Sequence, residues 1–183
     1  MNPFLKDLIQ VASWTVAVIG GLTAALVAIR QLKLNTQQRK TELRWKQANA
    51  AKEIIDDIHN NNWAKNAVAM LDWSEGKHRF RFEGGNTVEI SYENDVLAAL
   101  TKKHGECSDL EQDIIYCFDW FFYFINRIEH YIRTELIKFE DVEDVFNIYG
   151  EKIKQNEQVF ENFMQVHSYR LAVDFWKRHG ADL

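Results

Sequence analysis

The residues best placed for chemistry fall close together in the stretch from about Ser108 to Arg133, which the apolar spacing predicts to be helical. Asn126 and Glu129 lie one turn apart and share a face of this helix. If that face points inward, they predict a buried polar network, and a hydrogen-bonded structural pair is its simplest form. Glu129 and His130 are adjacent, so their side chains diverge and do not form an acid–base couple.

No recognised catalytic motif is present in the chain. There is no phosphate-binding glycine loop, His-Glu-x-x-His sequence, nucleophile elbow or paired Cys-x-x-Cys. A zinc site could be imagined from His104, Cys107, Cys117 and His130, but their spacing matches no usual zinc pattern. We therefore expect no enzymatic activity, no metal and no cofactor.

Charge is distributed unevenly along the 183 residues, whose formal net charge is −5. Residues 1–60 contain eight Lys/Arg and five Asp/Glu, so the remainder is strongly acidic. Binding to nucleic acid needs a broad basic surface that displaces counterions, and this composition excludes nucleic acid as the main partner.

The longest uncharged stretch is 8–29, which Asp7 precedes and Arg30 follows. As a helix it would be about 33 Å long, enough to cross a hydrocarbon core of about 30 Å. A cleaved signal peptide has a shorter apolar core, and a buried helix of this length usually carries a polar face. Residues 1–30 are therefore predicted to form a transmembrane anchor, and 31–60 a polar helical neck.

Basic residues are concentrated on the C-terminal side of this segment. Because such residues stay in the cytoplasm, the N-terminus is predicted to lie outside and residues 61–183 to form a cytoplasmic helical domain. Four of them could contact lipid headgroups or could act only as the topology signal: Arg30, Lys33, Arg39 and Lys40.

Small residues recur every four positions inside the apolar segment. Rows of this kind allow two membrane helices to approach closely, although small residues are also common in membrane helices generally. The candidate self-association face consists of Ala17, Gly20, Gly21, Ala24, Ala25 and Ala28. It predicts a homo-oligomer.

The rest of the chain is predicted to be a helical bundle with one small β-hairpin at about 78–92, so the fold class is mainly α. The hairpin is indicated by alternating apolar residues on either side of Gly84-Gly85. Ser108 and Glu111 form a capping box that opens the long helix. Its second face carries Tyr116, Trp120 and Tyr123, so the helix is apolar all round, which is typical of the buried centre of a bundle.

The run Phe118–Phe139, FDWFFYFINRIEHYIRTELIKF, followed by Glu140-Asp141-Val142, resembles a recurring bacterial pattern. It is similar to an uncharacterised domain-of-unknown-function family of single-pass membrane proteins with a polar neck and a cytoplasmic helical domain. Thr134-Glu135 stands where such chains often have Gly. The resemblance implies a bacterial inner-membrane location and no established activity.

Two functions fit these features best. The first is a single-pass inner-membrane protein whose cytoplasmic domain serves as a protein-interaction or scaffold module. The second is a membrane effector or sensor in bacterial stress or phage defence that acts through its transmembrane helix. The expected partners are the lipid bilayer, further copies of the chain and an unknown cytoplasmic protein.

Overall fold

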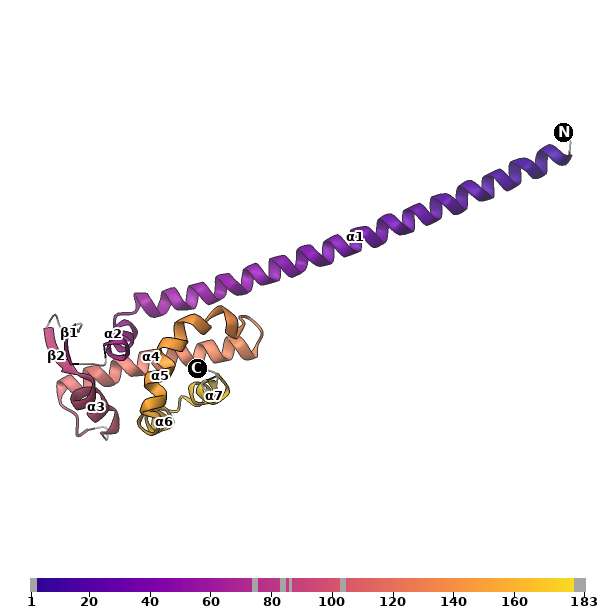
Figure 1. Cartoon of the computed structure of the whole chain (residues 1–183). Coiled ribbons are helices and arrows are strands. Elements are labelled where there is room, and N and C mark those ends of the chain that lie inside the picture. Colours follow the sequence, from indigo (N-terminus) through magenta and orange to yellow (C-terminus); the bar gives the residue numbers. More distant parts are fainter. Residues whose placement is uncertain (1–2, 74–75, 83–84, 86, 103–104, 180–183) are drawn as a thin grey trace. The chain divides into compact units, whose positions relative to one another are not determined.

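A computed structural model describes residues 3–73, 76–82, 85, 87–102 and 105–179, without the side chains of residues 3, 5–13, 16–18 and 148. It is mainly helical with one two-stranded hairpin, which confirms the predicted fold class at that level (Figure 1). The chain divides into two compact units, Met1–Lys46 and Gln47–Leu183.

Helix α1, Pro3–Asn60, forms all of the described part of the first unit and contributes its last residues to the second. In the first unit, every residue from 19 to 46 is exposed. Within the residues that the structure describes, no helix has an apolar stretch long enough to cross a membrane. The side chains of 8–13 and 16–18, which belong to the predicted membrane segment, lie outside the described residues.

In the second unit, the end of α1 buries Ala51, Ile54 and Ile58, which recur at helical spacing and therefore share one face. Asn60 ends α1, and α2, Asn62–Asp72, begins after Asn61, whose side chain accepts a hydrogen bond from the Ala64 amide at 2.9 Å.

The hairpin consists of β1, Lys77–Arg81, and β2, Thr87–Ser91, paired antiparallel. Phe80 and Ile90 turn toward the core, and Arg79 pairs with Glu89 across the strands at 3.1 Å on the solvent side. A single hairpin is only marginally stable by itself, so its burial against the helices is what holds it. A π-helical turn, Tyr92–Val96, leads from β2 into α3, Leu97–Thr101.

The centre of the second unit is α4, Asp109–Arg133, against which α2 and α7 pack most extensively. Its first turn is closed by the predicted capping box: the Ser108 amide donates to Glu111 Oε2 at 2.8 Å, and the Ser108 hydroxyl accepts from the Glu111 amide. Phe118, Phe121 and Phe122 are fully buried along one side of α4.

Helix α4 ends at Arg133 with Thr134 as its C-cap, and Glu135 then adopts a left-handed conformation with φ of 58°. Glycine is favoured at such a position because it has no Cβ to crowd the backbone. The carbonyl of Glu135 accepts a hydrogen bond from the buried Gln47 side chain at 2.9 Å, so this turn is tied to the end of α1 within the same unit.

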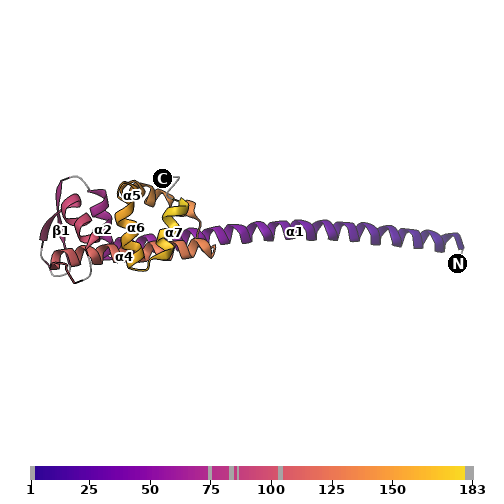
Figure 2. The same cartoon turned by 90° about the horizontal axis from the view of Figure 1, so that it is seen from below.

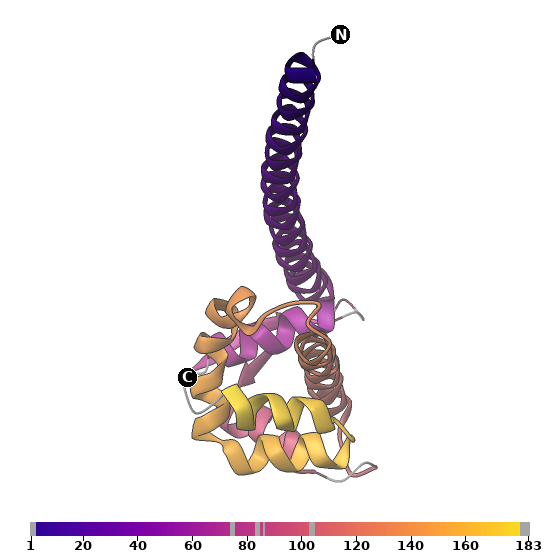
Figure 3. The same ribbon diagram turned by 90° about the vertical axis from the view of Figure 1, so that its right-hand side faces the viewer.

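The remaining elements are a 3₁₀ turn, Phe139–Asp141, and three helices: α5, Glu143–Gln155; α6, Glu157–Val166; and α7, Arg170–His179. Helices α6 and α7 contact each other, and α7 also lies along α4 (Figures 2 and 3). Phe160, Phe163 and Phe175 from these helices close the aromatic core around α4.

Candidate functional site

The most unusual surface of the second unit is a row of three aromatic side chains on α4. Tyr116, Trp120 and Tyr123 are 46 %, 41 % and 45 % exposed, and their spacing of four and three residues places them on one helix face. We call this row the aromatic stripe. The expectation that α4 is buried on every face is therefore wrong, because this side stays partly open to solvent, although Trp63 of α2 packs against Tyr116 with ring centroids 5.8 Å apart.

Beside the stripe, the Asp119 side chain contacts two residues from the α6–α7 connection. His167 Nδ1 lies 2.9 Å from Asp119 Oδ1, and the Tyr169 hydroxyl lies 3.0 Å from the Asp119 carbonyl oxygen and 3.3 Å from Oδ1. Burial, and next the neighbouring Asp119 carboxylate, raises the pKa of the Tyr169 phenol. Tyr169 is thus a neutral hydrogen-bond donor at physiological pH.

Together these residues form a surface pocket at the edge of the aromatic stripe. It has a volume of about 370 Å³ and is lined by Asp119, Trp120, Tyr123 and Tyr169. We call it the Asp119 pocket. Its walls are aromatic rings and its polar group is a carboxylate, and both of these favour a cation.

A carboxylate that orients a histidine is also the arrangement that activates a nucleophile in many hydrolases. Here, the His167 ring contacts Asp119 and the aromatic rings of Phe163 and Tyr169. The ring stacks on Phe163, with centroids 4.2 Å apart. The pair therefore positions Asp119 and connects α4 to the end of α6.

The sequence did not indicate this pocket because Asp119 and His167 are 48 residues apart and belong to no recognised motif. The one available signal was Asp119 itself, a charged residue inside a run of aromatic ones. The charged Asp119 side chain marks the face of α4 that meets solvent. Trp120 and Tyr123 therefore lie at the edge of that solvent-exposed face.

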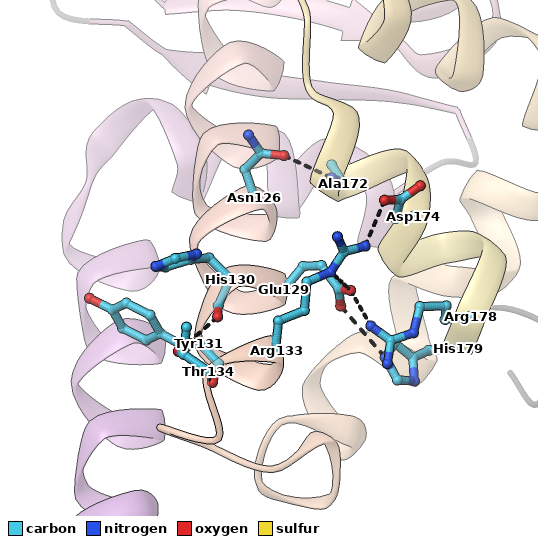
Figure 4. Close-up of polar contacts among 10 residues, drawn as sticks. All are labelled: Asn126, Glu129, His130, Tyr131, Arg133, Thr134, Ala172, Asp174, Arg178 and His179. Carbon is cyan, nitrogen blue, oxygen red and sulfur yellow. Dashed lines mark hydrogen bonds and ion pairs between the residues drawn. The ribbon is translucent and has the colours of Figure 1, made fainter.

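Asn126, predicted to join a buried polar network, contacts the first turn of α7. Its Oδ1 accepts a hydrogen bond from the Ala172 amide at 2.8 Å (Figure 4). The first amides of a helix have no partner within that helix, so Asn126 acts as a capping group supplied by a neighbouring helix.

Glu129, the second residue of the predicted network, contacts the other end of α7. Its side chain is fully buried, and Oε1 accepts from Arg133 Nε at 2.8 Å and from Arg178 Nη1 at 2.5 Å. Oε2 lies 3.7 Å from His179 Nε2, and Arg133 also binds Asp174 at 2.6 Å. Asn126 and Glu129 thus hold the two ends of α7, while the adjacent His130 is exposed.

The candidate membrane residues lie on α1. Gly20, Gly21, Ala24, Ala25 and Ala28 are exposed, and a Cβ added at either glycine would meet no atom of the described residues within 4 Å. Arg30, Lys33, Arg39 and Lys40 are exposed as well. The side chain of Ala17 lies outside the described residues.

The imagined zinc set is not assembled in the part of the chain that the structure describes. Cys117 is buried in the core and Cys107 is partly exposed before α4, while His104 lies outside the described residues. Among the described residues, no group of three His, Cys, Asp or Glu side chains could hold a metal ion.

Comparisons of the chain with protein-family models, with curated proteins and with solved structures gave no match.

Proposed function

We propose that this protein is a membrane-anchored interaction module whose folded domain binds a protein partner through the aromatic stripe. The observation that carries the proposal is the exposure of Tyr116, Trp120 and Tyr123 on one face of α4. The rest of that helix has a densely packed aromatic core behind it, so the stripe is held on a rigid support.

Aromatic side chains at such positions suit binding better than any other role. Scattered exposed apolar residues are ordinary, but a contiguous row of large aromatic residues marks an interaction surface. Trp and Tyr dominate the hot spots of protein interfaces because they bury a large area and lose few rotamers on binding.

The membrane location is the second part of the proposal and is supported by the sequence of 8–29, which has no charged residue. One polar side chain in this segment is already satisfied: the Thr23 hydroxyl donates within the helix to carbonyl oxygens of Ile19 and Gly20, at 3.0 and 2.9 Å. A hydroxyl bonded in this way is tolerated in hydrocarbon. The basic flank keeps the domain in the cytoplasm, and the small-residue face pairs copies of the chain.

The partner-binding role can be tested with a photo-crosslinking residue in place of Tyr116 in the full-length chain. We expect a discrete adduct in cells, and we expect Trp120→Ala to reduce its yield by about tenfold or more, as hot-spot truncations do. Trp73→Ala is the matched control, because Trp73 is 53 % exposed but lies at the end of α2.

An adduct of equal yield in Trp120→Ala and Trp73→Ala would contradict the proposal, and so would the absence of any adduct in the unmodified chain. Circular dichroism of each variant confirms that the fold is retained. An adduct consisting only of two copies of this chain would show that the stripe is a self-association surface, and it would also contradict binding to a separate partner.

The anchor can be tested by alkaline extraction of membranes from cells that express the full-length chain with a C-terminal reporter. We expect the chain to remain in the membrane with the reporter in the cytoplasm. Leu22→Arg together with Leu26→Arg should release it, because each charge in mid-span costs about 3 kcal/mol. Leu32→Arg together with Leu43→Arg, in the neck, should leave the chain in the membrane. Release of the unmodified chain by alkaline extraction would refute the anchor.

A further inference from the structure

The Asp119 pocket has a composition that suits a positively charged ligand. Three of its four lining residues are aromatic, and the fourth is a carboxylate that is 27 % exposed. The rings of Trp120 and Tyr123 stand edge to face, with centroids 5.6 Å apart at 82°, so they form two walls at right angles. Aromatic faces attract cations through their quadrupole.

The Asp119 carboxylate is fixed in orientation while one of its oxygens keeps its capacity to accept hydrogen bonds. His167 Nδ1 and the Tyr169 hydroxyl both approach Oδ1. Oδ2 accepts no hydrogen bond from the described residues. A ligand that carries both a positive charge and an N–H group would satisfy Oδ2 and the aromatic walls together.

A neighbouring contact shows that this face of α4 already binds a cation. The Arg127 guanidinium lies 5.9 Å from the centroid of Tyr123 and 5.6 Å from that of Phe124. Asp57 pairs with Arg127 at 3.2 Å, which offsets part of the arginine charge. Arg127 is not among the residues that line the Asp119 pocket.

We propose that the Asp119 pocket binds the side-chain ammonium group of a lysine on the protein partner. The proposal rests on the proposed function, of which it specifies the recognition chemistry. Residues 47–183 contain fifteen Lys/Arg and twenty-five Asp/Glu, so the domain attracts a basic partner. Lysine fits better than arginine, whose planar fork pairs with two oxygens, and better than a quaternary ammonium, which has no N–H.

The test uses the full-length chain with n-butylammonium as the lysine probe and tetramethylammonium as the quaternary probe. Binding is followed by the NMR signal of the Trp120 indole N–H, assigned from its loss in Trp120→Phe. We expect n-butylammonium to move the signal with a millimolar Kd, as suits so small a ligand, and to bind more tightly than tetramethylammonium.

Asp119→Asn should raise the Kd for n-butylammonium by about tenfold, because it removes the charge but keeps an oxygen for His167 and Tyr169. Asp113→Asn, on the same helix but outside the pocket, should leave the Kd unchanged. Tyr123→Leu leaves the Asp119 contacts in place and should also weaken binding, since it removes one aromatic wall.

The proposal is overturned if no saturable shift occurs up to about 100 mM, far above a millimolar Kd. It is also overturned if Asp119→Asn binds as tightly as the unmodified chain, or if tetramethylammonium binds more tightly. Its failure can be told from failure of the proposed function. If Trp120→Ala abolishes the crosslinked adduct and Asp119→Asn does not, the interaction surface stands and the lysine assignment falls.

Discussion

Replacing Phe122 by alanine is expected to lower the free energy of unfolding by about 4 kcal/mol, because it removes a fully buried ring and leaves a cavity. Phe122 lies within 5.2–6.3 Å, between ring centroids, of Phe118, Phe121, Phe160, Phe163 and Tyr169. These partners come from α4, α6 and the α6–α7 connection, which cannot all move inward to fill the space. Urea unfolding of the full-length chain, followed by circular dichroism, measures the change.

Tyr123→Ala is the matched control for this prediction. Tyr123 is the next residue on α4 but is 45 % exposed, so its removal should cost less than about 1 kcal/mol. Similar costs for the two variants would contradict the assigned packing. Because Phe122 supports the ring of Tyr169, Phe122→Ala should also weaken n-butylammonium binding at the Asp119 pocket.

Glu129→Ala is expected to lower the free energy of unfolding by about 3 kcal/mol. The change empties a fully buried site and removes charge-assisted hydrogen bonds to Arg133 and Arg178. Both arginine side chains are partly exposed, at 39 % and 50 %, so they can turn to solvent and leave no buried charge behind. The cost therefore stays below that of breaking a fully buried ion pair. The same urea titration measures it.

Two further variants isolate the cause. Glu129→Gln keeps the shape and one acceptor oxygen, so it should cost clearly less than Glu129→Ala. Asp174→Ala removes a partner of Arg133 that is 47 % exposed and should cost less than about 1 kcal/mol. If Glu129→Ala proved as mild as Asp174→Ala, the buried carboxylate would not be what holds the end of α7.

The helical class, the hairpin and the capping box could be predicted because each depends on neighbours in the sequence. Alternating apolar residues on either side of Gly84-Gly85 indicate two strands and a turn. Ser108 and Glu111 are three residues apart and satisfy each other's amides wherever the helix lies. Such signals need no knowledge of which elements pack together.

The candidate site could not be predicted in the same way, since it depends on contacts between distant elements. Periodicity showed that Tyr116, Trp120 and Tyr123 share a face, but how far that face is exposed depends on how α2 and α7 pack against α4. The partners of Glu129 are likewise on α7, 49 residues further along the chain in the case of Arg178.

The attachment of α7 at both its ends has a consequence for biosynthesis. Asn126 and Glu129 emerge from the ribosome well before the residues that satisfy them, and Phe175 fills the core only when α7 arrives. Until then Asn126 and Glu129 lack their partners on α7, and the rings of Phe139 and Phe146 lack their contacts with Phe175. Native closure is therefore delayed until α7 has been translated, and a product truncated before Arg170 would keep the chaperone-binding character of an unfinished chain.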